Sequence, residues 1–127
     1  MSAEHKFLLC RHCGNLVGVL ADAGQPLFCC GEEMQELKAN TAEASVEKHL
    51  PVVKSEGGKV SVSVGSVAHP MSDAHHIAWV YLLTQKGGQR KCLGIDGPAE
   101  AEFLLLADQA VAVFAYCNLH GLWKTVV

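Results

Sequence analysis

The stretch KVSVSVGSV, residues 59–67, indicates the fold class of this chain. Val60, Val62 and Val64 fall on one face of an extended segment, and serines fall on the other. A period of two is typical of a β-strand with one buried face, whereas a helix repeats every 3.6 residues. The stretch therefore predicts a strand that packs its valines into a core.

Two further apolar runs extend this pattern. HIAWVYLLT covers residues 76–84, and FLLLADQAVAVFAYC covers residues 103–117. The second run is long enough for a helix, but its later alternation and the break at Asp108 and Gln109 favour two strands. Several short strands at this spacing, separated by turns with glycine or proline, predict an antiparallel β-sandwich.

The segment before these strands has a different composition. NTAEASVEKHLP, residues 40–51, reads as a short helix or turn that Asn40 or Thr41 would cap and Pro51 would end. Upstream, FLLC and LVGVL suggest two short strands around the CRHCG turn, and LFCCGEEM suggests a second turn. We expect a small domain at residues 1–38 and a β-sandwich domain at residues 39–127.

Four of the six cysteines lie in the small N-terminal domain: Cys10, Cys13, Cys29 and Cys30. A domain shorter than about 40 residues usually needs a metal, disulfides or a partner subunit to fold. Because neighbouring side chains of a strand point to opposite faces, Cys29 and Cys30 must lie in a bend to share an ion, and Gly31 makes that bend easier. Four thiolates so placed favour a metal over disulfides, without distinguishing iron from zinc.

Composition limits the classes of function. Of the 127 residues, 50% are hydrophobic and 18% are charged, which indicates a folded protein. The net charge of −3 argues against nucleic acid or an anionic membrane as a partner. No apolar run approaches the roughly 18 residues that span a bilayer. The start MSAEHKFLLC lacks the pattern of a secretory signal, so we expect a cytoplasmic protein with reduced cysteines.

Histidines and a cysteine mark the ends of the expected strands: His49, His69, His75, Cys117 and His120. A single histidine in such a place is more often a hydrogen-bonded loop residue than a ligand. Four of them together with a thiol at strand–loop junctions indicate a shared metal site at one end of the sandwich. We expect His5, His12 and His76 at the surface, and Cys92 as a small, partly buried side chain.

The order of motifs along the chain resembles the desulfoferrodoxin family, the two-iron superoxide reductases. These motifs are CxxCG, CCG, EKHxP, VGSVxHPM and YCNxHGLWK. The resemblance implies a small desulforedoxin-like domain with a rubredoxin-like Fe(Cys)4 centre. It also implies an immunoglobulin-like β-sandwich with a second iron, held by four histidines and one axial cysteine, that keeps its sixth position open.

Carried onto this chain, the resemblance implies two iron ions and specific ligands. The first centre takes Cys10, Cys13, Cys29 and Cys30, and the second takes His49, His69, His75, His120 and Cys117. His76 stands where the family commonly has tyrosine; we choose His75 because it follows His69 by six residues, as in the family's pattern.

The resemblance also implies an activity and partners. The expected reaction reduces superoxide to hydrogen peroxide with one electron, supplied by a rubredoxin-like donor. Separately, we expect a homodimer, because the N-terminal domain is too small to bury much surface alone. Lys48 would attract superoxide, and Glu47 matches the glutamate that can occupy the sixth position of the oxidised iron. A non-catalytic electron carrier or iron-binding module is the alternative, and a zinc-stabilised interaction domain is a third possibility.

Overall fold

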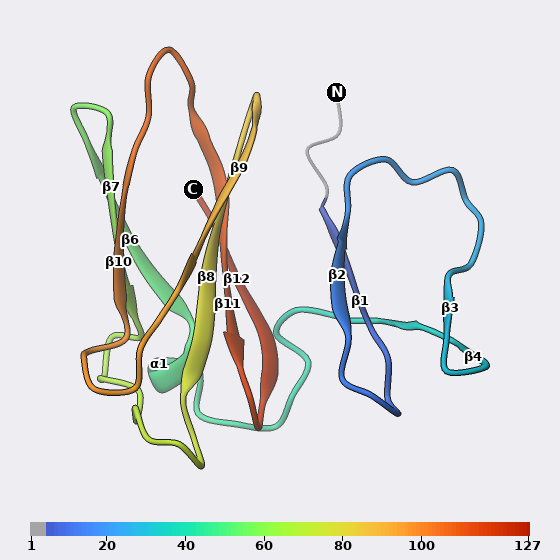
Figure 1. Cartoon of the computed structure of the whole chain (residues 1–127). Helices are drawn as coiled ribbons and strands as arrows, with labels where there is room; N and C mark the ends of the chain where they lie inside the picture. Colours follow the sequence, from blue (N-terminus) through green and yellow to red (C-terminus); the bar gives the residue numbers. More distant parts are fainter. Residues whose placement is uncertain (1–4) are drawn as a thin grey trace. The chain divides into compact units, whose positions relative to one another are not determined.

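The computed structural model describes residues 5–127 and divides the chain into two compact units, residues 1–38 and residues 39–127 (Figure 1). Residues 1–4, on which part of the expectation about a secretory signal rests, lie outside the described residues. Strands dominate both units, which confirms the all-β prediction. Within residues 5–127, no helix has the length and apolar character that crossing a membrane requires.

The N-terminal unit consists of two small antiparallel assemblies. One is the sheet β2-β1-β5, with bounds Lys6–Leu9 (β1), Leu16–Val19 (β2) and Gln35–Glu36 (β5). The other is a hairpin of β3 (Phe28–Cys29) and β4 (Glu32–Glu33). The buried apolar residues described in the N-terminal unit are Phe7, Leu8, Cys10 and Met34. So small a core supplies little hydrophobic stabilisation, which agrees with the expected need for a metal or a partner.

The second unit is a sandwich of two antiparallel sheets. The three-stranded sheet has the order β10-β7-β6, with bounds Glu100–Leu104, Lys59–Val64 and Pro51–Glu56. The four-stranded sheet has the order β12-β11-β8-β9, with bounds Gly121–Val126, Ala110–Cys117, Ile77–Thr84 and Gly87–Cys92. Figure 1 shows the two sheets facing one another, with the short helix α1 (Val46–His49) near one end of the sandwich.

The core lies between these two sheets. Val60, Val62 and Val64 of β7 are all buried, as their alternation predicted. They pack with side chains of the other strands, including Phe103 of β10 and Val113 of β11. The sandwich thus forms because strands of both sheets, among them β7, β10 and β11, turn an apolar face inward.

The structure corrects the expected start of the helix. Asn40 and Thr41 lie outside α1, which begins at Val46 with Ser45 at the N-cap position. Asn40 instead has a left-handed φ of 62°, and its side chain bridges to the backbone of Lys124. The prediction failed because the strand β12, far along the chain, offers Asn40 partners that local sequence cannot reveal.

The loop after β7 lies close against α1. The Val67 N–H donates to the carbonyl oxygen of Glu47 over 2.9 Å, and the Ser66 hydroxyl donates to the same oxygen over 3.2 Å. A Cβ at Gly65 would lie 2.6 Å from that oxygen and 2.9 Å from the carbonyl oxygen of Leu50. Only glycine therefore fits at position 65 without moving the backbone of α1.

We expect Gly65→Ala to destabilise the second unit by about 1–3 kcal/mol, because the added methyl meets backbone rather than a flexible side chain. Urea unfolding followed by tryptophan fluorescence measures this, since Trp79 and Trp123 both lie in residues 39–127. Gly97→Ala is the control, because a Cβ there meets open space. Equal stability of the two variants would contradict the close approach at Gly65.

Candidate metal centres

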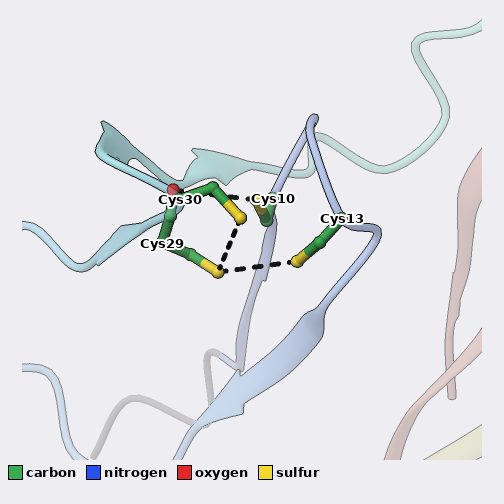
Figure 2. Close-up of side chains that lie close together, drawn as sticks. All are labelled: Cys10, Cys13, Cys29 and Cys30. Carbon is green, nitrogen blue, oxygen red and sulfur yellow. Dashed lines mark hydrogen bonds between the residues drawn. The ribbon is translucent and has the colours of Figure 1, made fainter.

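Two turns bring four cysteines together in the N-terminal unit. Cys10 and Cys13 lie in the turn between β1 and β2, and Cys29 and Cys30 lie where β3 turns into β4. Cys30 has a φ of 54° and Gly31 a φ of 79°, so two successive residues are left-handed. This is the bend that was expected for adjacent cysteines, and it turns both side chains toward the other pair (Figure 2).

The four sulfur atoms all lie within 4.8 Å of one another. Cys29 Sγ is 3.6 Å from Cys13 Sγ and 4.0 Å from Cys30 Sγ (Figure 2). Cys10 is buried, whereas Cys13 and Cys30 are exposed. All six cysteines of the chain lie within the described residues and are free thiols. The group thus has the spacing and the chemistry of a tetrahedral thiolate site for zinc or iron.

The thiols of this group do not ionise alike. The backbone N–H groups of Cys13 and His12 lower the pKa of Cys10 to about 6. The pKa of Cys30 is raised to about 12, first by its interaction with Cys13 and then by those with Cys10 and Cys29. Crowded thiols therefore resist full ionisation together, and a bound cation would allow all four to become thiolates.

A second group of donors gathers in the sandwich. His49 ends α1, His69 and His75 lie in the loop between β7 and β8, and Cys117 ends β11. Their donor atoms all lie within 4.8 Å of one another. His120, in the turn before β12, joins them: its Nδ1 is 3.1 Å from His49 Nε2 and 3.8 Å from Cys117 Sγ.

Hydrogen bonds fix which nitrogen two of these imidazoles present. His49 Nδ1 lies 2.7 Å from the carbonyl oxygen of Ser45, and His69 Nδ1 lies 2.7 Å from that of Pro70. Because a carbonyl can only accept, each Nδ1 carries the proton and each Nε2 keeps its lone pair. The two Nε2 atoms are 3.1 Å apart. Histidines that bind metals are oriented in this way by a carbonyl on the far nitrogen.

The environment of His75 gives further evidence that this group suits a metal ion. Its Nε2 is buried, and the described residues offer it no hydrogen-bond partner. Burial lowers the pKa of His49, of His75 and of His69, whose pKa falls to about 4, so these imidazoles are neutral at neutral pH. Buried, neutral nitrogens whose lone pairs face one another fit a metal cation, since a cation satisfies all of them at once.

Cys117 reaches this group through the regular pattern of β11. Val113, Ala115 and Cys117 alternate inward and are all fully buried, so the thiol is the last core-facing position of its strand. Next to it the pairing shifts: Tyr116 pairs with Trp79, but Cys117 pairs with Ile77. Such irregularities often lie beside functional sites, where they redirect a side chain.

Trp123 is a supporting residue that the sequence reading missed. Its ring stacks on the His49 imidazole, with centroids 5.0 Å apart and planes at 25°. Its Nε1 donates to the carbonyl oxygen of His120 over 3.2 Å. The buried side chain of Trp123 thus contacts both His49 and His120. The apolar pattern of β12 predicted neither contact.

The other histidines that the sequence analysis singled out are not among these donors. His12 is exposed and lies 2.9 Å from a carboxylate oxygen of Glu32. His76 bonds through Nδ1 to the carbonyl oxygen of Ser72 over 2.9 Å, so His75 and not His76 turns to the other donors. His5 and His76 are half-buried rather than fully at the surface.

The expectation of a partly buried Cys92 is wrong. Cys92 is exposed at the end of β9, and Arg90 Nη1 lies 2.8 Å from its sulfur. β9 forms an edge of the four-stranded sheet and packs against only one neighbouring strand. An apolar residue type gives no information about such an edge position.

Glu47 and Lys48 occupy the exposed side of α1, directly before the buried His49. The positive charge of Lys48 contributes to the lowered pKa of both His49 and His75, so its ammonium acts on the donor group. The structure thus combines a buried set of donors with an exposed lysine that directly precedes one of them in α1.

The fold and the donor groups define the class of this protein. It is a metalloprotein with two metal centres, one in a small four-cysteine unit and one in a β-sandwich with a His/Cys donor group. The family profile described as "Desulfoferrodoxin" matches residues 41–126, and "Desulfoferrodoxin, N-terminal domain" matches residues 3–37. The chain belongs to the desulfoferrodoxin family, which confirms the resemblance.

Individual relatives agree over nearly the whole chain. The desulfoferrodoxin of Nitratidesulfovibrio vulgaris is 44% identical over 124 residues, 98% of each protein. The crystal structure of the superoxide reductase from Treponema pallidum is similar with a TM-score of 0.82 at 44% identity, covering 96% of this chain and 98% of that one. The superoxide reductase (1Fe-SOR) of Giardia intestinalis is similar over 64% of this chain and 97% of its own, with a TM-score of 0.52 and 31% identity.

We expect the metal-free second unit to lose stability as the pH falls from about 6.5 toward 4. The unfolded chain takes up protons on its histidines first, while burial keeps His69 neutral down to a pKa of about 4. For His69 alone this difference corresponds to about 3 kcal/mol at the acid end. Urea unfolding at a series of pH values measures it.

His69→Gln should flatten this pH dependence, whereas His12→Gln, which changes an exposed histidine of the other unit, should leave it unchanged. A stability that stays level between pH 6.5 and 4 in the unsubstituted protein would contradict the burial of neutral imidazoles.

Proposed function

We propose that this chain is a superoxide reductase, which converts superoxide, one electron and two protons into hydrogen peroxide without forming oxygen. The observation that carries the proposal is the convergence of four imidazoles and one thiol at one end of the sandwich, beside an exposed lysine. Family membership and the superoxide reductases among the relatives support it.

Both donor groups bind iron in this proposal. Cys10, Cys13, Cys29 and Cys30 hold one ion, and His49, His69, His75, His120 and Cys117 hold the other. When bound in the second group, iron supplies the electron that superoxide takes up. Imidazole suits Fe(II), and five protein donors leave an ion that takes six with one position for a small ligand. The thiolate of Cys117 donates electron density, which favours the transfer.

The residues around the second group bind and orient the anion. Lys48 draws superoxide to the exposed side of the donors, because its ammonium is a compact positive charge on a surface helix. The same charge stabilises the negative charge that develops on the product before protons arrive. Glu47, on the same turn, would supply a carboxylate as a further ligand to the iron.

The four-cysteine unit is proposed to receive electrons from a rubredoxin-like donor. Cys13 and Cys30 are exposed, so the group lies where a small carrier protein can approach it. A pure electron carrier would need neither the His/Cys group nor Lys48, and for this reason we favour the enzyme over the carrier.

Assembly and location form part of the proposal. Leu20, Leu27 and Phe28 of the N-terminal unit are exposed by 94%, 45% and 66%, apolar surface that a second copy of the chain would cover in a homodimer. Six free thiols agree with a reducing compartment, which supports a cytoplasmic location. Sedimentation equilibrium tests the dimer: a monomer at micromolar concentration would contradict it.

The activity is tested by adding a pulse of superoxide to the reduced, iron-loaded protein. One peroxide should form for each superoxide consumed, with no oxygen evolved. Two superoxide consumed for each peroxide, with oxygen released, would instead indicate a dismutase.

We expect Lys48→Ala to slow the second-order reaction with superoxide by about tenfold and to weaken its dependence on ionic strength, because steering by one charge is lost. Iron content should not change. Lys54→Ala removes an exposed lysine from β6 and should retain the rate. An unchanged rate and salt dependence in Lys48→Ala would exclude the steering role.

Cys117→Ser should abolish the thiolate-to-iron absorption of the second centre in its oxidised form, since a serine hydroxyl cannot replace the sulfur donor. Cys92→Ser, at an exposed thiol outside both groups, should leave that absorption intact. The visible spectrum of each oxidised variant provides the measurement. Persistence of the band in Cys117→Ser would remove Cys117 from the ligand set.

A further inference from the structure

Asn118 joins two loops that carry members of the His/Cys group. Its Oδ1 accepts a hydrogen bond from the N–H of His76 over 2.8 Å, and its Nδ2 donates to the carbonyl oxygen of Ala74 over 3.0 Å. Its backbone N–H donates to the carbonyl oxygen of His76 over 3.2 Å. Three hydrogen bonds thus connect the residue after Cys117 with both neighbours of His75.

The loop that carries His75 is otherwise bonded mainly to itself. Ser72 N–H and Ser72 Oγ both donate to the carbonyl oxygen of His75, over 2.9 and 3.2 Å, and His75 N–H donates back to Ser72 Oγ over 3.2 Å. The ring of His76 bonds to the carbonyl oxygen of Ser72. These bonds shape the loop but do not attach it to the strands that hold Cys117 and His120.

The end of this loop is attached to β11 where Ile77 pairs with Cys117, and the side chain of Asn118 adds two hydrogen bonds next to that pairing. The Nε2 of His75 is buried without a hydrogen-bond partner among the described residues, so no bond at its ring fixes the imidazole from the donor side. His49 and His69, by contrast, each have a carbonyl on Nδ1 that orients the ring. His75 is thus oriented through its backbone. Ser72 holds that backbone within the loop, and Asn118 is the side chain that connects the two residues flanking His75 to the Cys117–His120 turn.

We propose that Asn118 is a positioning residue that sets the distance between His75 and the Cys117–His120 turn. This role rests on the proposed function, because it presupposes that the His/Cys group binds iron. Asn118 touches neither the donor atoms nor the substrate. It acts by fixing the two backbone segments from which one imidazole and the Cys117–His120 donors project.

The chain offers a matched control for the bonds themselves. Asn40 makes the same kind of bridge within the same unit: its Nδ2 donates to the carbonyl oxygen of Lys124 over 3.0 Å, and its Oδ1 accepts from the Lys124 N–H over 2.8 Å. Both asparagines are exposed, and each bridge joins segments distant in the sequence. Asn40 lies in neither of the two donor-bearing loops, so Asn40→Ala reports the loss of two such bonds, together with the strain of alanine at a φ of 62°, without a change at the metal.

The experiment compares Asn118→Ala and Asn40→Ala in the full-length chain. Competition with a chromophoric chelator measures the affinity for Co²⁺ at the second centre, and the visible spectrum reports the sulfur-to-cobalt absorption. Residues that orient metal ligands typically contribute about 10–100-fold in affinity. We expect Asn118→Ala to lose about tenfold or more and to shift the absorption, and Asn40→Ala to match the unsubstituted protein in both.

Hydrogen exchange provides a readout without metal. In the metal-free protein the amide of His76 is protected by Asn118 Oδ1, so its exchange should accelerate in Asn118→Ala and stay slow in Asn40→Ala. If the alanine variant does not fold, Asn118→Asp takes its place. The aspartate keeps the acceptor for the His76 N–H and loses only the donor to the Ala74 carbonyl. The His76 amide should then stay protected from exchange, while the affinity for Co²⁺ falls. Equal affinities and spectra in the Asn118 and Asn40 variants would overturn the positioning role.

The two proposals fail in different ways. If the unsubstituted protein shows no sulfur-to-cobalt absorption that depends on Cys117, the proposed function is wrong and the role of Asn118 falls with it. If that absorption is present and Asn118→Ala leaves it and the affinity unchanged, only the positioning role is wrong.

Discussion

The donor-bearing end of the second unit depends on one electrostatic constraint: the lone pairs of His49 Nε2 and His69 Nε2 meet in a buried space. His49 Nε2 lies 3.1 Å from the nitrogen of two other imidazoles, and His75 Nε2 has no partner among the described residues. Protonating these rings is unfavourable because burial and mutual repulsion lower their pKa values. A metal cation relieves this conflict, so in the proposed account metal binding and the stability of the sandwich end are linked.

The sandwich supplies the rigidity that such a site needs. β11 carries Cys117 as the continuation of its core-facing row, so the thiol is held by the same packing that buries Val113 and Ala115. The loops that deliver the histidines are then attached to this frame: α1 by the close approach at Gly65, and the His75 loop by Asn118. Lys48 stays on the exposed side of α1. Buried donors and an exposed lysine directly before one of them match what is needed to receive a small anion.

The sequence predicted those structural features that are determined by residues close together in the chain. The alternating valines predicted β7, the break at Asp108 and Gln109 separated β10 from β11, and the adjacent cysteines with Gly31 predicted the left-handed bend. The family's motifs predicted which side chains would gather, because their order and spacing are specific. In each of these cases the determining residues are neighbours in the chain.

The sequence did not predict features that depend on contacts with strands distant in the chain. The bridge from Asn40 to Lys124 displaced the expected helix cap, and the edge position of β9 exposed Cys92. The stacking of Trp123 on His49 and the bonds of Asn118 to the His75 loop join residues 74 and 42 positions apart. Such contacts follow from the tertiary arrangement, and one sequence carries no local signal for them.

Anomalous diffraction at the iron edge, from crystals of freshly isolated protein, tests the central claim most directly. The account predicts an iron peak enclosed by the Nε2 atoms of His49, His69 and His75, the Nδ1 of His120 and the sulfur of Cys117, separate from a peak among the four N-terminal sulfurs. Iron confined to the four-cysteine group, with the imidazoles turned apart, would contradict it.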